Sequence, residues 1–448
     1  MNVVYKAKKA ATFPKEWMEE GSDAFLTDQR MGLMKNSMTF IHAADLHLDS
    51  PFVGLKYLPT QLFERMREST FLAFSRLITF AIKEQVDFML LSGDLYDGEE
   101  RSLKAQLRLK KEFDRLHAAG IEVYVIHGNH DHLGGKWLDL EWPDNVHVFS
   151  SEHVEMKVFL KNGAPLAYIY GYSYPARSVT ENMTAHYVKQ DNASVYHIGM
   201  LHGSIEGNKE HDVYCPFKVN ELINKDFDYW ALGHIHKRKL LHENNPIIAY
   251  SGNIQGRHRK ESGEKGFYLV EMNEEASTAS FISAEEVIWA DVEVSVEGLH
   301  NVSELIQQCE EIIGEIRQNQ RSTCLTIEFT GTGDLATSLE TSQTVQDIMD
   351  ALNDDEDDSS RFVWVVKILN KTHQHNENNP KLTSFFTDLH TTVENYHSFA
   401  EVTQPLMQHP IYRKYIEEFT LEEQQQLLKE AERLLHNELL KQSGVRDR

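Results

Sequence analysis

Thiols are scarce in this chain of 448 residues, which contains three cysteines, Cys215, Cys309 and Cys324. Their number is odd and their spacing matches no metal-binding pattern, which argues against a disulfide scaffold and a cysteine zinc site. Long hydrophobic runs are also missing, because no stretch of about 18 apolar residues and no signal-peptide pattern occurs. We therefore predict reduced, buried thiols, no association with a membrane and a cytoplasmic location.

Positive charge is in short supply as well. The formal net charge is −24, which argues against a protein that coats nucleic acid by bulk charge alone. The acidic surplus is uneven, since residues 291–448 hold 13 basic and 29 acidic side chains. Most of the negative charge therefore lies outside the part of the chain that carries the motifs described below.

The length predicts two or three domains rather than one ordinary core. The first residues lack clear periodicity, and we interpret them as a flexible extension, or as a start codon assigned too early, in preference to a functional arm. The predicted organisation is an N-terminal extension at 1–37, an α/β domain at 38–290, a smaller α/β domain at 291–380 and a helical region at 381–448.

Strands and helices alternate through the larger predicted domain. Helices are predicted at 62–83 and after Ser102, the second with Leu103, Leu107, Phe113 and Leu116 on one side and its end at Gly120. Short apolar runs predict strands at 39–44, 87–92, 123–126, 168–171, 196–201, 229–232, 247–251 and 266–271, and in the smaller domain at 291–296, 324–330 and 362–368.

Five short polar motifs follow the ends of these predicted strands, where open α/β sheets place their sites. A lone histidine after a strand is more often a satisfied polar residue than a ligand, so each motif alone is a weak signal. Together, in this order, they predict a metal site. The motifs are Asp45-Leu46-His47, Gly93-Asp94-Leu95-Tyr96-Asp97, Gly128-Asn129-His130-Asp131, Leu201-His202-Gly203 and Gly233-His234-Ile235-His236.

The ligand types indicate which ions would bind. Carboxylate, amide and imidazole donors without a thiolate suit manganese, iron or zinc. Residues i and i+2 of an extended segment point the same way, so Asp45 with His47, and His234 with His236, can each reach one site. The number of ligands fits two ions, and a carboxylate can bridge ions about 3.5 to 4 Å apart. Asp94 is the natural bridge.

These motifs resemble those of the calcineurin-like metallophosphoesterases. Their order and spacing, with the C-terminal extension, are similar to SbcD-type DNA repair exonucleases, especially the bacterial YhaO-like branch. The resemblance covers residues 38–290, and beyond them only the general layout is similar. It implies an α/β fold, namely a four-layer α/β/β/α sandwich with a smaller α/β cap domain and C-terminal helices.

The resemblance also implies roles for individual residues. His130 would stabilise the transition state or protonate the leaving oxygen, and Asp131 would orient a histidine. Asp97 stands where archaeal and eukaryotic repair nucleases tend to carry histidine, so its role stays open. One ion would be held by Asp45, His47, Asp94 and His236, and the other by Asp94, Asn129, His202 and His234.

A cluster of cations lies close to the last metal motif. In an acidic protein such a local excess could hold a polynucleotide backbone beside the ions, and a solvated loop without a ligand is the alternative. No basic segment interleaved with aromatic residues is evident for stacking single strands. The candidate DNA contacts are Lys237, Arg238, Arg257, Arg259, Lys260 and Lys265.

The C-terminal stretch carries a capping box and an apolar stripe. The stripe either packs on its own domain or, as the resemblance suggests, docks on the coiled-coil root of an SbcC-like ATPase. A homodimer is also open. The capping box is Thr420 with Glu423, and the stripe is Leu427, Leu428, Ala431, Leu434, Leu435 and Leu439.

The sequence therefore predicts a hydrolase that acts on phosphate ester bonds with two divalent metal ions, of which Mn²⁺ fits best. The leading hypothesis is a manganese-dependent DNA exonuclease in DNA repair that cleaves phosphodiester bonds with a metal-activated hydroxide. The first alternative is a phosphomonoesterase or protein phosphatase on the same fold, because such motifs recur across phosphate esters. The second alternative is a non-catalytic DNA-binding scaffold subunit.

Overall fold

The computed structural model describes much of the chain between residues 37 and 435. The predicted extension at 1–37 therefore lies outside the described residues except for its last one, and so do Thr420, Glu423 and Leu439. Within that span, the residues not described are 53–54, 56–57, 99–101, 136–137, 139, 193, 208–212, 319–320, 355, 357–360, 375–379, 397, 408–418, 420, 422–423, 426 and 433.

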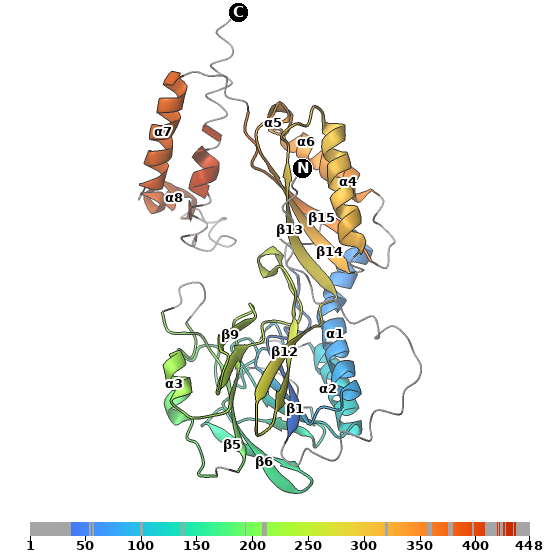
Figure 1. The fold of residues 1–448 in the computed structure, drawn as a ribbon, viewed down its shortest axis with the longest axis vertical. Coiled ribbons are helices and arrows are strands. Elements are labelled where there is room, and N and C mark those ends of the chain that lie inside the picture. The colour runs from blue at the N-terminus through green and yellow to red at the C-terminus, as the bar shows by residue number, and fades with distance from the viewer. Residues whose placement is uncertain are drawn as a thin grey trace, which may run out of the picture. The chain divides into compact units, whose positions relative to one another are not determined.

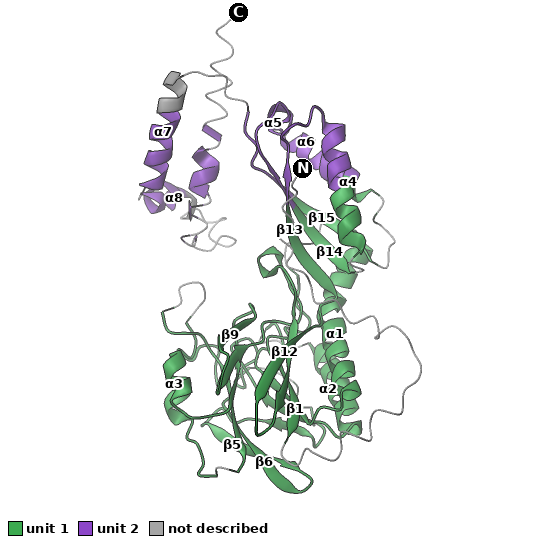
Figure 2. Ribbon diagram, in the orientation of Figure 1, with its two compact units in different colours: residues 1–292, 311–326, 352–367 green, residues 293–310, 327–351, 368–448 purple. Residues whose placement is uncertain are grey.

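The chain divides into two compact units, which Figure 2 shows in green and purple. The domain boundaries predicted at 290 and 380 stay predictions. The first unit comprises residues 1–292, 311–326 and 352–367, and the second comprises residues 293–310, 327–351 and 368–448.

The first sheet has six strands in the order β12-β11-β1-β2-β3-β4. Figure 1 labels two of them, β1 and β12. Strands β1 to β4 are parallel, and β11 and β12 add antiparallel. Because parallel strands share one carboxyl edge, the segments after β1, β2 and β3 all emerge on the same side of the sheet. The strands are β1 (Met38–Ala43), β2 (Phe88–Ser92), β3 (Glu122–Ile126), β4 (Val146–Val148), β11 (Gly266–Met272) and β12 (Ser277–Ser283).

The second sheet also has six strands, in the order β5-β6-β7-β8-β10-β9. Strands β6, β7, β8 and β10 are parallel, and the edge strands β5 and β9 are antiparallel to their neighbours. The parallel strands β7 and β8 end at His202 and Gly233, within the last two metal motifs. The strands are β5 (Glu155–Lys161), β6 (Ala164–Gly171), β7 (Tyr196–His202), β8 (Tyr229–Gly233), β9 (Lys239–His242) and β10 (Ile247–Tyr250).

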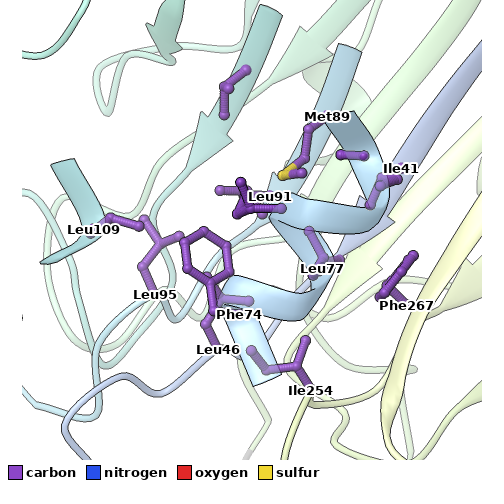
Figure 3. Packing of buried hydrophobic residues seen from close by; sticks show 14 of the residues in the cluster. Ile41, Leu46, Phe74, Leu77, Met89, Leu91, Leu95, Leu109, Ile254 and Phe267 are labelled. Carbon is purple, nitrogen blue, oxygen red and sulfur yellow. The ribbon is translucent and has the colours of Figure 1, made fainter. Parts of the chain in front are cut away.

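The alternation of side chains along each strand produces the layers. Ile41, Met89 and Leu91 point from the first sheet into a core formed with helices α1 (Thr60–Lys83) and α2 (Leu103–Ala118), as Figure 3 shows. Their neighbours Phe40 and Leu90 face the second sheet in a separate buried cluster. The outer face of the second sheet packs against loops and α3 (Val219–Ile223). The predicted four-layer α/β/β/α sandwich is thus confirmed.

The predicted second helix has the expected start but a different buried face. The Ser102 hydroxyl accepts a hydrogen bond from the Ala105 amide at 3.1 Å, so it caps α2. Phe113 and Leu116 are buried as predicted, whereas Leu103 and Leu107 are 47% and 49% exposed, so their placement on that side was wrong. The core face instead continues through Leu109, and Leu107 lies two residues, about 200°, around the helix from it.

A smaller sheet has the order β13-β14-β15, and the boundary between the units runs through its strands. No helix among the described residues is long and apolar enough to cross a membrane. The remaining elements are β13 (Val287–Ser295), α4 (Val302–Gln318), β14 (Ser322–Thr330), α5 (Leu335–Ser338), α6 (Ser342–Asn353), β15 (Val363–Asn370), α7 (Pro380–Glu394) and α8 (Phe399–Met407).

Candidate metal centre

The five polar motifs meet at the carboxyl edges of the two sheets in the first unit. Their backbone is unusual, because Asp45, His47, Asp94 and His234 have φ values of 52°, 43°, 53° and 96°. The left-handed region costs a non-glycine residue roughly 1–2 kcal/mol, and it persists only where surrounding contacts enforce it. Here the amides of Asp45 and His47 donate to the carbonyls of Gly93 and Asp94, both at 3.0 Å. The turns after β1 and β2 therefore hold each other in place.

A first group of ligand atoms comes from both sheets. The Nε2 atoms of His47 and His236 lie 3.0 Å apart, and both belong with Asp45 to a set of donor atoms within 4.8 Å of one another. Asp94 Oδ2 lies 3.9 Å from His47 Nε2. Two imidazole nitrogens and two carboxylates thus converge on one position.

A second group lies on the other side of Asp94. His202 Nε2 is 3.0 Å from the Asn129 amide oxygen and 3.4 Å from Asp94 Oδ2. His234 Nδ1 is 3.3 Å from the same Asn129 oxygen. The structure thus brings together the residues predicted for each of the two positions, and Asp94 lies within reach of both.

Glycines allow these ligands to approach the backbone. A Cβ atom on Gly128 would lie 2.4 Å from Asp94 Oδ1 and 2.6 Å from His202 Nε2. One on Gly93, where φ is 92°, would lie 2.4 Å from His202 Nδ1. Neither position could carry a larger residue without displacing a candidate ligand.

Burial and mutual proximity shift the pKa values of the ligands. Burial, assisted by the Arg257 charge, lowers the pKa of His47 to about 3, so this imidazole is neutral at pH 7. Burial alone would lower the pKa of His202, but the Asp94 carboxylate overrides it and raises that pKa to about 9. Burial would also raise the pKa of Asp94, and the charge and hydrogen bond of His202 instead hold it well below its usual range. A divalent ion would therefore take the place of the proton on His202.

The donor set fits divalent ions. It consists of buried carboxylate, amide and imidazole groups without thiolate, which is the ligand chemistry of manganese, iron or zinc. All seven predicted ligands contribute to the two groups. The structure thus provides candidate ligands for a dinuclear site.

Comparison with known proteins identifies the family. The family model for calcineurin-like phosphoesterases matches residues 38–238, and that for the middle domain of metallophosphoesterase YhaO matches residues 289–373. Metallophosphoesterase YhaO of Bacillus subtilis is 43% identical over 406 residues, which cover 91% of this chain and 99% of that protein. The chain belongs to the calcineurin-like phosphoesterases. The predicted resemblance is confirmed, and the protein is a phosphate ester hydrolase.

More distant relatives of this phosphoesterase carry names from DNA repair. The DNA double-strand break repair protein Mre11 of Methanocaldococcus jannaschii is 29% identical over 61% of this chain and 73% of its own length. The SbcD component of the nuclease SbcCD of Staphylococcus epidermidis is 25% identical over 57% of this chain and 73% of its own length. The phosphoesterase thus shares sequence with Mre11 and SbcD over more than half of its length.

His130 of the phosphoesterase is outside both predicted ligand sets, but a ring nitrogen of His130 lies within 4.8 Å of donor atoms of His47 and Asp97. Its amide donates to Asp94 Oδ1 at 2.9 Å. Its ring Nδ1 lies 2.9 Å from the Asp97 carbonyl oxygen. Because a carbonyl can only accept, Nδ1 is protonated. His130 is partly exposed.

Asp131 supports the site mainly through the backbone. Its carboxylate accepts hydrogen bonds from the amides of Asp94, Leu95 and Gly128 at 3.2, 2.9 and 2.7 Å. Its Oδ2 also lies 3.0 Å from His127 Nδ1. Asp131 therefore fixes the turn that presents Asp94, and its predicted role in orienting a histidine stays a prediction.

The predicted DNA contacts divide into buried and exposed side chains. Arg257 pairs with Asp97, and the buried Lys265 donates to the His236 carbonyl at 3.1 Å, so both point inward. Arg259 pairs with Asp291 at 2.9 Å. Lys237, Arg238 and Lys260 are exposed. Arg257 and Lys265 thus lie beside the metal ligands, and contact of these six residues with DNA stays a prediction.

One residue at the site escaped the sequence analysis. Glu261 lies in a short 3-10 turn and contacts His236 Nδ1 at 2.6 Å. Its side chain is nearly buried. The sequence did not indicate this burial, because an acidic residue next to several charged residues is usually exposed. The available signal was its position, since it directly follows the cations of residues 257–260.

Proposed function

We propose that this phosphoesterase is a manganese-dependent DNA exonuclease that works in DNA repair in the cytoplasm. The observation that carries the proposal is Asp94, which reaches both ligand groups while the His130 amide holds its other oxygen. Such an arrangement suits the in-line cleavage of a phosphodiester between two ions. The names of the Mre11 and SbcD relatives support DNA as the substrate, and the buried, free thiols suit a reducing compartment.

The seven ligands would hold two divalent ions, which lower the pKa of a water molecule and neutralise the phosphate oxygens. Manganese suits this mixture of oxygen and imidazole donors. The protein contributes fixed ligand directions, because the turns after β1 and β2 are hydrogen-bonded to each other and Asp131 ties the turn after β3 to that after β2. The proposed ligands are Asp45, His47, Asp94 and His236 for one ion and Asp94, Asn129, His202 and His234 for the other.

His130 would handle the proton of the leaving oxygen. The Asp97 carbonyl fixes its Nδ1–H, which leaves Nε2 to carry a second proton and deliver it as the phosphorus–oxygen bond breaks. The Asp94 oxygen that accepts the His130 amide keeps the histidine close to both ion positions. Asp97 would thus act through its backbone carbonyl as well as its side chain.

DNA would approach over the exposed cations near the centre. Lys237 and Arg238 directly follow the ligand His236, and Lys260 lies in the short 3-10 turn at Arg259–Glu261. The Arg238 guanidinium lies 3.6 Å from the centre of the Phe281 ring, a contact that holds the cation at the surface. We propose that these side chains and Arg259 contact phosphates of the DNA backbone.

The decisive experiment offers the purified protein with MnCl₂ an end-labelled DNA duplex and, separately, p-nitrophenyl phosphate. We expect release of labelled nucleotides from the duplex, and loss of this activity in Asp94→Ala. Hydrolysis of the small ester alone would identify a phosphomonoesterase. DNA binding without hydrolysis of either compound would indicate a scaffold subunit, and nuclease activity that Asp94→Ala leaves unchanged would come from a contaminant.

A partner is proposed for the C-terminal region. Leu427, Leu434 and Leu435 are 38%, 60% and 51% exposed, which supports an apolar surface for a partner. We propose that it docks on the coiled-coil root of an SbcC-like ATPase, and a second copy of the chain is the competing occupant. Deleting residues 411–448 should abolish capture of the ATPase while two ions remain bound, whereas retained capture would refute docking at this site. Light scattering with and without the segment tests the homodimer.

A further inference from the structure

Two liganding histidines of one ion position are each backed by a carboxylate. His47 Nδ1 lies 3.1 Å from Asp97 Oδ1, and His236 Nδ1 lies 2.6 Å from Glu261 Oε1. An ionised carboxylate only accepts hydrogen bonds, so the hydrogen bond to Glu261 places the proton of His236 on Nδ1, and the close Asp97 carboxylate favours the same tautomer of His47. The two Nε2 lone pairs, 3.0 Å apart, then face the same point. Asp97 and Glu261 thus set the direction in which each imidazole binds the ion.

A single arginine joins these carboxylates. The Arg257 guanidinium pairs with Asp97 through Nη1, and its Nη2 lies 3.5 Å from Glu261 Oε1. The backbone amide of Arg257 also donates to Glu261 Oε2 at 2.7 Å. The exposed fraction of the Arg257 side chain is 13%, so water competes little with these contacts. The planar guanidinium can hold two carboxylates at a fixed separation, which an ammonium group cannot do.

The segments that meet at Arg257 are far apart in the chain. Asp97 follows β2, where the Ser50 hydroxyl also donates to it at 3.2 Å, and Glu261 ends the 3-10 turn after β10. Asn253 fixes Glu261 further through a hydrogen bond of 2.9 Å. Arg257 therefore connects the turn that carries Asp94 with the segment that supports His236.

The contacts of Arg257 are confined to one ion position. Its Nη2 lies 3.3 Å from His236 Nδ1, against the ring that Glu261 holds. Besides the shared Asp94, the other position is formed by Asn129, His202 and His234, and none of the described contacts of Arg257 reaches those three residues. Loss of the guanidinium should therefore affect the two positions unequally.

We infer that Arg257 is a positioning residue that holds Asp97 and Glu261 at a set separation and thereby orients His47 and His236 toward one of the two ions. The inference rests on the proposed two-metal function. It assigns this arginine to the support of one metal position and not to contact with DNA. It also separates the two ions, since only the one bound by His47 and His236 depends on the Arg257 bridge.

The test measures metal binding in Arg257→Met with MnCl₂ by titration calorimetry. We expect two ions per wild-type chain, and in the variant one ion with unchanged affinity and one bound about 10- to 100-fold more weakly. At one equivalent of Mn²⁺ the variant should give the electron paramagnetic resonance signal of an isolated ion, without coupled pairs. Arg65→Met is the matched control, because Arg65 pairs with the buried Glu286 at 2.8 Å outside the centre and should keep two ions.

Activity measurements add a readout that distinguishes positioning from substrate contact. Excess Mn²⁺ should restore kcat of Arg257→Met toward the wild-type value while KM for DNA stays unchanged. The inference would be overturned if Arg257→Met bound both Mn²⁺ ions with wild-type affinity and had a raised KM for DNA. Arg257 would then be a DNA contact. If Arg257→Met does not fold, Arg257→Lys serves instead, because lysine keeps the charge but bridges the carboxylates poorly. If Arg257→Lys binds both Mn²⁺ ions with wild-type affinity, the inference is equally refuted.

These outcomes are independent of the nuclease proposal. A wild-type protein that binds two ions but leaves DNA intact would refute the nuclease, while selective weakening in Arg257→Met would still support the positioning role. Conversely, a nuclease whose ions both bind normally without Arg257 would refute only the inference made for this residue.

Discussion

At the scale of single residues, the metal centre depends on a glycine without a side chain as much as on the ligands. Gly128 stands between β3 and the predicted ligand Asn129, and its missing side chain leaves room for Asp94 and His202. Both neighbours are fully buried and hydrogen-bonded, so neither can move aside at low cost. The identity of residue 128 is thus tied to metal binding.

Gly128→Ala should therefore weaken Mn²⁺ binding at least tenfold, since the new Cβ would overlap Asp94 Oδ1 and His202 Nε2. Titration calorimetry measures the affinity directly. The matched control is Gly314→Ala in helix α4, where a Cβ meets nothing within 4 Å. This control should raise the free energy of unfolding by about 0.5–1 kcal/mol, because alanine is the better helix former, and leave metal binding unchanged. Wild-type Mn²⁺ affinity in Gly128→Ala would show that the turn can relax.

His130→Ala should separate catalysis from metal binding. His130 is outside both proposed ligand sets, and we propose that its Nε2 protonates the leaving oxygen, so we expect two bound Mn²⁺ ions and a kcat reduced about 10²- to 10⁴-fold. Metal analysis and nuclease rates on the same preparation provide both readouts. His147→Ala is the matched control, because His147 pairs with Glu122 on the edge of the first sheet and should leave both unchanged. Loss of an ion from His130→Ala would instead make His130 a ligand.

The ligands could be predicted from the sequence because each directly follows a strand, and parallel strands present such residues at one edge. The supporting residues could not. Glu261 lies 25 residues beyond His236 with no strand end beside it, and Arg257 faces an acid 160 positions away in the chain. In the sequence both belong to a charged run that resembles a solvated loop. Only the folded arrangement of β2 and the segment after β10 reveals their contacts.

At the scale of elements, the four strands missing from the prediction of the larger domain are the edge strands of its two sheets. Strands β4 and β12 border the first sheet, and β5 and β9 border the second. Edge strands bury less surface than central ones, and these four contain mostly half-buried or exposed residues. Their sequences therefore lack the continuous apolar runs by which the central strands were predicted, such as that of β2.

A buried histidine ties the two sheets together through β1 and β8. His42 Nε2 donates to the Leu232 carbonyl at 3.1 Å, and the Tyr229 hydroxyl donates to Nδ1 at 2.9 Å. Both contacts suit the neutral ring, which donates through Nε2 and accepts through Nδ1. Burial accordingly lowers the pKa of His42 to about 3, from an ordinary value of 6.5. The connection between the sheets is thus sensitive to acid.

The depressed pKa of His42 has a defined effect on stability. The unfolded chain binds a proton below about pH 6.5 and the folded chain does not until about pH 3, so the contribution is present above 6.5 and is lost as the pH falls toward 3. Between pH 7.5 and 5.5 the loss is roughly 1.4 kcal/mol. His42→Gln cannot take up this proton. Between pH 7.5 and 5.5 its free energy of unfolding, measured in urea, should therefore fall by roughly 1.4 kcal/mol less than that of the wild type. Equal pH dependence in both proteins would contradict the assignment.

At the scale of the whole molecule, negative charge limits how DNA can bind. The net charge of −24 repels a polyanion, so attraction must come from few side chains near the metal centre. Of the six cations predicted for this purpose, Arg257 and Lys265 are engaged inside the site. The sequence could place the cations near the last metal motif, but it could not distinguish a buried ion pair from an exposed charge.

Reversing two of the exposed charges should therefore weaken DNA binding strongly. In Lys237→Glu/Lys260→Glu we expect the slope of log Kd against log salt concentration to decrease by about two. Each phosphate contact contributes about 0.9 to that slope. Fluorescence anisotropy with a labelled duplex between 50 and 200 mM salt, roughly the range over which such contacts are screened, measures it. Lys111→Glu/Lys367→Glu is the control, because it makes the same change in net charge at exposed positions on α2 and β15. If both double variants lose affinity equally, the overall charge governs binding, and Lys237 and Lys260 are not phosphate contacts.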